Sequence, residues 1–328
     1  ALQEAAGAYA NETGYSRTDY MVKLSFEPDW ARKNLFELKL GYSELDADET
    51  YLGLNSADLA DDPWSRYPAS AADNIENEHF RSYLRHLLEY DSDTSLSTTL
   101  YYNGFARDWL KLDSVNGGNA ARVILTDPGI LRGESLADFD IKSNDREYYL
   151  YGIQSQLTKF FTTGALRHDL TLGARLHKDK IDRYQDAYYF NDVYAGDFDF
   201  SNPSVRTGPD EEGNREQESL ALALFAHDRI ESGKWAFTPG LRWEHIDWDY
   251  IRRDGRTPPE TGSGSYSVLA YGLGIEYEID GSSKLFGGYH RGFSVPSPGG
   301  RLDELEEETS DTFEFGYRYE SAQSFYGE

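Results

Sequence analysis

The stretch TFEFGYRYE at residues 312–320 shows the pattern that decides the fold. Its aromatic side chains fall on alternate positions, at Phe313, Phe315, Tyr317 and Tyr319, and the positions between them are polar or glycine. Alternation with period two places successive side chains on opposite faces of a β-strand. One face of this strand therefore meets an apolar medium and the other meets water.

The same alternation recurs along the chain, for example in NLFELKLGYS at residues 34–43 and in LRHDLTLGARLH at residues 166–177. It predicts eleven strands, with a twelfth opening near Ser324. The predicted strands are 16–26, 34–43, 79–90, 95–109, 147–158, 166–178, 217–230, 235–250, 266–279, 284–292 and 309–320.

The connections between these strands alternate in length. Short connections carry turn-forming residues such as Pro28, Gly164 and Gly233. They lie near 27–33, 91–94, 159–165, 231–234 and 280–283, and the long ones are 44–78, 110–146, 179–216, 251–265 and 293–308. In an up-and-down meander this asymmetry puts all long loops at one end, as in outer-membrane barrels. The sequence therefore predicts an all-β, antiparallel up-and-down transmembrane β-barrel.

Composition excludes several other classes. The 328 residues include 58 Asp and Glu against 32 Lys and Arg, a formal charge of −26 that argues against nucleic-acid binding. The lack of cysteine rules out disulfides, a thiolate nucleophile and Cys-ligated metals. Aromatic residues make up 15% of the chain, which is untypical of disordered acidic chains. The longest clean apolar run, residues 220–226, is far shorter than the roughly 18 residues of a membrane-spanning helix.

Three soluble all-β proteins are the alternatives: a propeller, a solenoid and an acidic carbohydrate-binding protein. A propeller requires a constant repeat, whereas the spacing of the short turns drifts from about 70 to about 50 residues. A carbohydrate-binding protein would need the aromatic face inside a packed core.

Two stretches near the C-terminus, LFGGYHRGFSVPSPGG at 285–300 and LEEETSDTFEFGYRY at 305–319, resemble the barrel of TonB-dependent outer-membrane receptors. The residues in register with that family's pattern are Tyr289, Arg291, Gly292, Phe293, Pro296, Glu308, Ser310, Glu314, Gly316, Arg318 and Tyr319. The resemblance covers essentially the whole chain.

A further stretch, TYLGLNSADLADDPWSRYPASAADNIENEHFRSYLRHLLEYD at 50–91, is similar to the ferric-citrate receptor subgroup. The likeness rests on Tyr51, Leu52, Gly53, Leu54, Asp62, Pro63, Arg66, Tyr67, Ala69 and Ser70.

The resemblance implies a 22-stranded barrel in the outer membrane of a Gram-negative bacterium. Residues 1–328 then form a partial barrel domain with about half of the strands, and the plug domain is absent from this chain. It also implies contact with the TonB energy-transducing complex through that plug, and with outer-membrane lipid and lipopolysaccharide. Open strand edges cannot be tolerated in lipid, so the missing strands are expected from the rest of the polypeptide.

No catalytic constellation stands out, and the chain is not expected to be an enzyme. The seven histidines are scattered, without metalloprotease or nucleophile-elbow spacing. His86 and His168 fall on the apolar faces and are expected to pack. Acidic runs such as 46–49, 58–62, 197–199, 210–212 and 304–308 are expected to be solvated loops, with Ca²⁺ binding as the alternative. No resident metal or cofactor is predicted.

An anionic iron chelate entering an acidic protein needs local positive charge. Arginine suits this task because its guanidinium binds carboxylates through two parallel hydrogen bonds. The candidate ligand-binding residues are Arg66, Tyr67, Arg81, Arg85 and Arg107, with Trp64 as a further stacking surface. The alternative is that these arginines pair with carboxylates of the lumen or plug. Arg318 and Glu314 are expected to contact the plug.

The expected function is energised uptake of a ferric chelate, ferric citrate or a carboxylate siderophore, with iron carried as part of the ligand. The loops at 44–78, 110–146 and 179–216 are expected to close as lids. The alternative is a passive outer-membrane channel or surface barrel without energy coupling.

Overall fold

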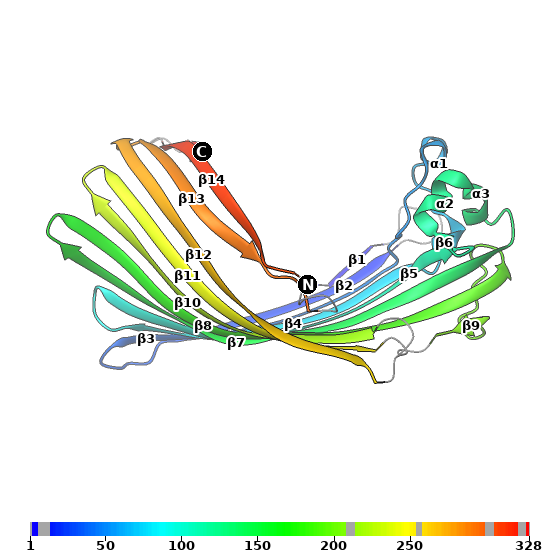
Figure 1. Cartoon of the computed structure of the whole chain (residues 1–328), viewed down its shortest axis with the longest axis horizontal. Coiled ribbons are helices and arrows are strands. Elements are labelled where there is room, and N and C mark those ends of the chain that lie inside the picture. The colour runs from blue at the N-terminus through cyan, green and yellow to red at the C-terminus, as the bar shows by residue number, and fades with distance from the viewer. Residues whose placement is uncertain are drawn as a thin grey trace.

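A computed structural model describes residues 2–5, 14–207, 214–253, 258–298, 305–320 and 326–327. They form a single antiparallel sheet in which each strand of the main path pairs with the next along the chain (Figure 1). The main path is β1 (Leu2–Ala5), β2 (Tyr15–Phe26), β3 (Lys33–Ala47), β4 (Asn74–Glu89), β5 (Thr94–Val115), β7 (Ala137–Thr163), β8 (Leu166–Val193), β10 (Asn214–Ser232), β11 (Trp235–Arg253), β12 (Glu260–Asp280), β13 (Ser283–Ser294), β14 (Glu308–Glu320) and β15 (Tyr326–Gly327). Two short strands lie beside it, β6 (Gly118–Asn119) on β5 and β9 (Val205–Arg206) on β8.

The eleven predicted strands are confirmed, as β2 to β5, β7, β8 and β10 to β14. The predicted short turns are also confirmed, and Gly164 and Gly233 take the positive φ angles of 62° and 58° that favour glycine in tight hairpins. Ser324 lies outside the described residues, and β15 pairs with β14 shortly after it. All short turns gather at one end of the sheet and the helices at the other (Figure 1).

Several predicted strand ends were wrong, because the strands run further toward the long connections. β5 ends at Val115 rather than at 109, β7 begins at Ala137 rather than at 147, and β8 ends at Val193 rather than at 178. The added segments contain consecutive polar positions, as in SNDRE at 143–147. Where both faces of a strand meet polar surroundings, the alternation that marks a strand disappears.

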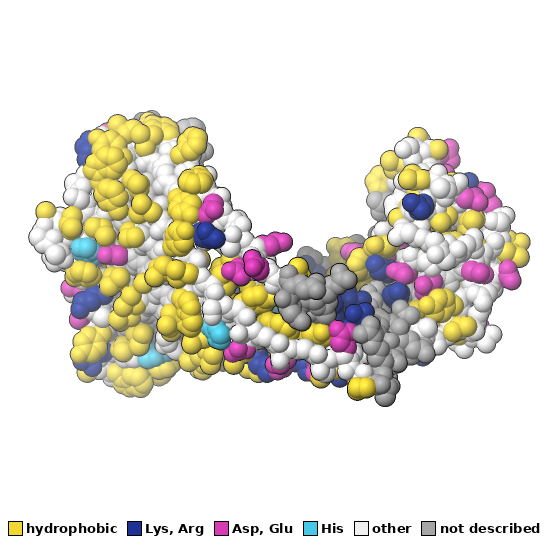
Figure 2. Space-filling view, viewed as in Figure 1, with side chains coloured by type: hydrophobic (Ala, Val, Ile, Leu, Met, Phe, Trp, Pro, Cys, Tyr) yellow, Lys and Arg dark blue, Asp and Glu magenta, His cyan; other side chains and the backbone are white. Residues whose placement is uncertain are grey.

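One face of the sheet, here called the outer face, carries a belt of exposed apolar side chains. Seven in-register positions on adjacent strands form one row of it: Leu24, Leu38, Leu84, Leu100, Ile153, Leu176 and Leu222. Leu24 is 58% exposed and Leu100 is 48% exposed. In Figure 2, hydrophobic side chains gather over the part of the sheet that carries the short turns. An apolar surface of this extent matches a hydrocarbon surrounding better than water.

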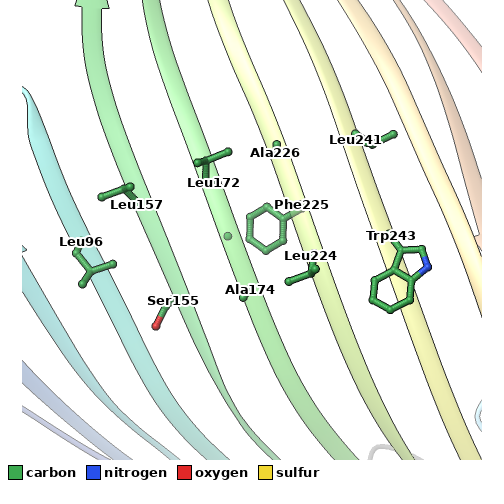
Figure 3. Close-up of a pocket in the computed structure, with 11 residues that line it drawn as sticks. Leu96, Ser155, Leu157, Leu172, Ala174, Leu224, Phe225, Ala226, Leu241 and Trp243 are labelled. Carbon is green, nitrogen blue, oxygen red and sulfur yellow. The ribbon is translucent and has the colours of Figure 1, made fainter.

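A shallow hollow in this belt shows its chemistry (Figure 3). The lining comes from β5, β7, β8, β10 and β11 and includes Leu157, Leu172, Leu224, Leu241 and Trp243. No charged side chain lines this hollow.

The belt ends where charges begin on the outer face. Lys178 pairs with Glu218 at 3.1 Å, and Lys180 pairs with Glu216 at 2.8 Å. Lys178 lies only two residues beyond Leu176 of the apolar row, so more than half of β8 lies beyond the belt. The opposite face of the sheet is here called the inner face.

The connections 48–73, 116–136 and 194–207 pack together into one body, here called the loop unit. It contains α1 (Ser56–Asp61), the 3-10 helix η1 (Pro68–Ser70), α2 (Ala120–Thr126) and α3 (Pro128–Leu131). α1 begins after Asn55, whose side chain accepts a hydrogen bond from the Asp58 backbone at 2.8 Å. Among the described residues, no helix is long and apolar enough to cross a bilayer.

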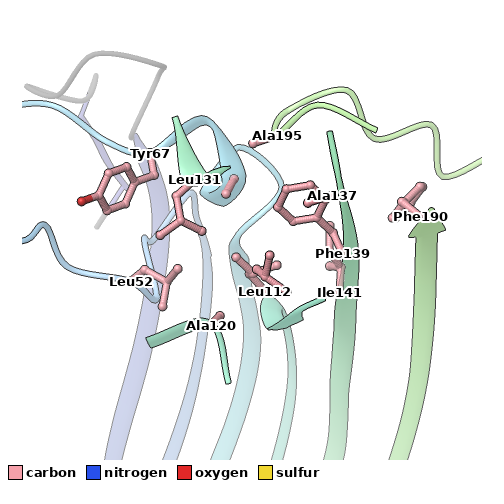
Figure 4. Packing of buried hydrophobic residues seen from close by; sticks show 12 residues of the cluster. Leu52, Tyr67, Leu112, Ala120, Leu131, Ala137, Phe139, Ile141, Phe190 and Ala195 are labelled. Carbon is pink, nitrogen blue, oxygen red and sulfur yellow. The ribbon is translucent and has the colours of Figure 1, made fainter. Parts of the chain in front are cut away.

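The loop unit packs on the upper ends of β5, β7 and β8 around one shared apolar core, shown in Figure 4. The core residues are Leu52, Tyr67, Ala69, Leu112, Val115, Ala120, Leu131, Ala137, Phe139, Ile141, Phe190 and Ala195. Arg132 of the second connection also binds both carboxylate oxygens of Asp58 in the first, each at 3.1 Å. The three connections that were expected to act as lids are therefore packed against one another rather than separate.

Candidate ligand site

Five arginines on five adjacent strands lie directly opposite one another in register: Arg107 of β5, Arg146 of β7, Arg183 of β8, Arg215 of β10 and Arg252 of β11. All five occupy inner-face positions, and we call them the arginine row. Neighbouring strands are about 4.8 Å apart, so the row spans roughly 20 Å. It lies beyond the level of the apolar belt, since Arg183 follows Lys178 by five residues.

Like charges opposite one another on neighbouring strands repel. Within the described residues, Arg107, Arg146, Arg183 and Arg215 take part in no ion pair with a carboxylate. The buried Nε atoms of Arg107, Arg146 and Arg215 have no hydrogen-bond partner among those residues. Burial, and then the guanidinium groups of Arg215, Arg146 and Arg252, lower the pKa of Arg183. Because guanidinium nevertheless stays protonated near neutral pH, an anion placed on the row would relieve this repulsion.

Aromatic side chains border the row on the side of the short turns. Phe105 and Tyr148 lie 5.8 Å apart between ring centroids, and Trp248 and Tyr250 stack at 6.3 Å. At the edge of the row, the guanidinium of Arg107 lies over the Trp109 ring at 5.7 Å. These rings place aromatic surface along one side of the row.

Buried amides border the row on the opposite side. Asn144, Gln185 and Asn214 are 6%, 3% and 3% exposed. Arg183 donates from Nε to Gln185 Oε1 at 2.7 Å, and its Nη2 donates to the same oxygen. Gln185 in turn donates from Nε2 to Asn144 Oδ1, and its backbone N–H donates to Asn214 Oδ1 at 2.6 Å. The central arginine is thus held by a neutral network.

The carboxylates next to these arginines in sequence lie on the other side of the sheet. They are Asp108, Asp145, Glu147, Asp182 and Glu216, all at outer-face positions. Because successive side chains of a strand point to opposite faces, adjacent residues of opposite charge cannot pair across it. The sheet therefore separates Arg107, Arg146, Arg183 and Arg215 from their acidic neighbours in sequence, whereas Glu260 lies on the inner face directly opposite Arg252.

Of the predicted site residues, Arg107 lies in the row, whereas Arg81 and Arg85 lie lower on the inner face of β4. Arg85 is 3.4 Å from Glu37, which also accepts a hydrogen bond from Tyr83 at 2.5 Å. Arg81 is 3.8 Å from Asp19. This pairing with wall carboxylates matches the alternative considered for these two residues.

Arg66 and Tyr67 lie inside the loop unit and are 5% and 3% exposed. Arg66 donates to the backbone oxygens of Ser70 and Asp73, the latter at 3.3 Å. Tyr67 donates to Asp58 at 2.6 Å, and burial, reinforced by this bond, raises the pKa of its phenol. The structure gives both residues a role in holding the loop, and Trp64 is 57% exposed beside them.

Sequence reasoning missed four members of the row: Arg146, Arg183, Arg215 and Arg252. The signal was present as arginines flanked by acids near strand ends, in RD at 107–108, DRE at 145–147, DR at 182–183 and RE at 215–216. These pairs became recognisable as one site only through the strand register.

The histidines expected to pack do so. His86 stacks on Phe36 at 4.4 Å between ring centroids, and His168 stacks on Phe161 at 4.5 Å. His168 Nδ1 also lies 2.7 Å from an oxygen of Asp228. In the described part of the chain, no three His, Asp or Glu side chains are grouped so as to hold a metal ion. The acidic run 210–212 and residue 304 lie outside that part.

The fold and this cation-lined inner wall are those of a receptor-type β-barrel, and comparison with known proteins agrees. The family model "TonB dependent receptor-like, beta-barrel" matches residues 29–327, so the chain belongs to that family. Members of the family are outer-membrane receptors and transporters rather than enzymes.

Solved structures with the same fold include several iron-chelate receptors. The unliganded ferric citrate transporter FecA matches with a TM-score of 0.75 and 20% identity, over 98% of this chain and 44% of its own. The siderophore receptor PiuA from Acinetobacter baumannii matches with 0.77 and 16%, over 98% and 50%. The ferric-catecholate import receptor Fiu from K12 E. coli matches with 0.69 and 13%, over 97% and 50%. This chain thus spans about half the length of these receptors, and the likeness concerns the fold.

Proposed function

We propose that the intact protein is an energised outer-membrane receptor that takes up an anionic ferric chelate, ferric citrate or a carboxylate siderophore, bound on the arginine row. The observation that carries this proposal is the in-register set of five arginines, four of which have no carboxylate partner in the described part of the chain. Guanidinium and carboxylate groups match in geometry and charge, and each pair forms two parallel hydrogen bonds.

The site suits a ligand whose unmetallated carboxylates face the row. Such a ligand would neutralise guanidinium groups that now repel one another, which adds to its affinity. The aromatic border offers flat surfaces against which the body of the chelate can pack. No bond of the chelate needs to break, so the protein requires no catalytic residue, and iron enters as part of the ligand.

A chain of contacts connects the row to the loop unit. Trp109 lies under Arg107 and makes an edge-to-face contact with Tyr51 of the loop unit at 5.3 Å. Lys111 Nζ lies over the Tyr51 ring at 3.9 Å and over the Trp109 ring at 4.9 Å. A ligand that shifts Arg107 would therefore also displace Trp109 and the first connection of the loop unit.

The remaining partners follow from the family and from the outer face. Energy would come from the TonB complex through a plug domain elsewhere in the protein. Lipid would surround the apolar belt, and lipopolysaccharide would meet the charged layer above it, where Lys178 and Lys180 lie beside carboxylates.

The decisive experiment is uptake of radiolabelled ferric citrate by cells that carry the full-length receptor, with and without an uncoupler of the inner-membrane proton gradient. Uptake that the uncoupler abolishes, and that a receptor with both Arg146→Gln and Arg183→Gln lacks, would support energised transport through the row. Uptake that persists with the uncoupler would instead indicate a passive pore. No uptake of ferric citrate would overturn the assignment of this chelate.

A further inference from the structure

Gln185 is an uncharged residue that borders the arginine row next to its central member, Arg183. Its Oε1 accepts both hydrogen bonds from Arg183, at 2.7 Å from Nε, and its side chain is almost fully buried at 3% exposed. Guanidinium can only donate hydrogen bonds, so the oxygen of the amide must face it. The Nε2 of Gln185 is then directed to Asn144, and this orientation satisfies both ends of the amide.

The choice of an amide over a carboxylate has an electrostatic consequence. Several other inner-face arginines in this protein are paired with acids, as Arg229 is with Glu276 at 2.8 Å and Arg85 is with Glu37 at 3.4 Å. A carboxylate at 185 would bind Arg183 with the same geometry but would cancel its charge. The amide orients the guanidinium and leaves that charge available.

We propose that Gln185 is a positioning residue that holds Arg183 through a neutral acceptor, so that the central guanidinium is fixed in place and keeps its full charge for an anionic ligand. This proposal rests on the function proposed above and concerns how the arginine row is kept ready to bind an anion.

The surrounding contacts support a positioning role. Gln185 is itself fixed by its backbone N–H, which donates to Asn214 at 2.6 Å, and Asn214 Nδ2 donates back to the Gln185 carbonyl at 3.4 Å. Asn144 Nδ2 reaches the carbonyl of Trp109 at 3.5 Å. The network therefore ties Arg183 on β8 to β5, β7 and β10 without a single carboxylate.

The test measures equilibrium binding of two probes, ferric citrate and iron-free citrate, to the full-length receptor over a range of NaCl concentrations. Gln185→Glu keeps the shape and the acceptor but adds a charge, and Gln185→Met removes the acceptor without adding one. Gln156→Glu is the matched control, since Gln156 lies on the inner face of β7 ten residues from Arg146. Retained folding is checked by the heat-modifiable mobility of the barrel.

We expect Gln185→Glu to weaken the binding of both probes by about tenfold or more and to make binding less dependent on the NaCl concentration. Gln185→Met should cause a smaller loss and keep the salt dependence, and Gln156→Glu should bind like the wild type. If Gln185 only supports the structure, the order reverses: Gln185→Glu binds normally and Gln185→Met fails. That reversal would overturn the proposal.

The two probes separate this proposal from the proposed function. A receptor that binds iron-free citrate in the expected order of variants, yet neither binds nor takes up ferric citrate, would support the role of Gln185 and refute the chelate. A wild-type receptor that binds neither probe would overturn the role of Gln185. The transport function would then be tested separately, by measuring uptake in cells.

Discussion

Arg183 occupies the centre of the arginine row, with Arg146 opposite it on one side and Arg215 on the other. Its guanidinium has hydrogen bonds to Gln185 but no ion pair among the described residues. An anion bound at this position would touch the most strongly positive part of the inner wall. If the proposed site binds an anion, we therefore expect the contribution of a single guanidinium to be greatest at Arg183.

We predict that Arg183→Gln weakens binding of ferric citrate by about 10- to 100-fold, because a charge-assisted hydrogen bond contributes about 1.5–3 kcal/mol. Isothermal titration with the full-length receptor measures this change. Arg122→Gln is the control: it removes the same charge from an exposed position on α2, outside the row. Equal losses in both variants would show that only the net charge matters.

Asp73 connects the loop unit to the sheet. Its carboxylate accepts backbone N–H groups from Tyr51 at 3.0 Å and from Leu112 at 2.9 Å, and its side chain is 1% exposed. Burial raises the pKa of Asp73 above its ordinary value of 3.8, although the two backbone bonds oppose this shift. The folded loop unit therefore binds the Asp73 proton more tightly than the unfolded one does.

This shift predicts a pH dependence with a defined sign. The contribution of Asp73 to loop-unit stability is greatest below pH 3.8 and falls as the pH rises from there through the raised folded pKa. Asp73→Asn cannot titrate, so the wild type should gain stability relative to this variant as the pH is lowered from 7 toward 4. Hydrogen-exchange protection of the Tyr51 and Leu112 amides measures it. If the wild type instead gains protection relative to Asp73→Asn as the pH rises, the prediction is contradicted.

The loop unit behaves as an element of its own, because its three connections share one apolar core. Leu131 on α3 is 0% exposed and packs in that core, whereas Leu125 on α2 is 81% exposed. Shared packing makes the opening of one connection depend on the other two. Movement of this region in transport would therefore be movement of one body.

We predict that Leu131→Ala destabilises the loop unit by about 2–5 kcal/mol, the usual cost of a cavity left by a buried leucine. Hydrogen exchange should rise together in 48–73, 116–136 and 194–207, while the strands of the belt stay protected. Leu125→Ala, the same substitution at an exposed site of the same unit, should leave exchange unchanged. Faster exchange confined to 116–136 would show that the connections open independently.

Over the whole molecule, the outer face changes from apolar to charged along each strand, and this change sets the level of the membrane. Leu172 and Tyr184 illustrate it, because both lie on the outer face of β8 and both are 43% exposed. Leu172 lies within the belt, and Tyr184 lies beyond the Lys178 and Lys180 ion pairs. The two side chains are thus equally exposed, but Leu172 faces the apolar layer and Tyr184 faces the charged layer beyond it.

We predict that Leu172→Lys destabilises the intact barrel in lipid vesicles by about 2–4 kcal/mol, whereas Tyr184→Lys costs about 0–1 kcal/mol. Urea titration followed by the heat-modifiable mobility of the barrel measures both. In a soluble protein two equally exposed positions would respond alike, so equal costs would argue against a lipid-facing belt.

Much of the fold can be obtained from the sequence because alternation is a local property. Whether a segment such as 312–320 alternates depends only on its own residues, so the strand number and the two faces follow from alternation, and the connection lengths add the up-and-down order. The upper ends of β5, β7 and β8 were missed because polar runs such as 143–147 interrupt the alternation before each strand ends. The helices of the loop unit, three to seven residues long, are too short for a helical period to appear.

The site depends on pairing and packing, which no local pattern contains. Arg107 and Arg252 are 145 residues apart in the chain, and only the register of four strand pairs brings them into one row. Arg66 and Tyr67 carry suitable chemistry, but packing of the loop unit buries them. Local alternation therefore determined which residues face the inner wall, whereas the hydrogen-bond register between strands decided which of them stand together.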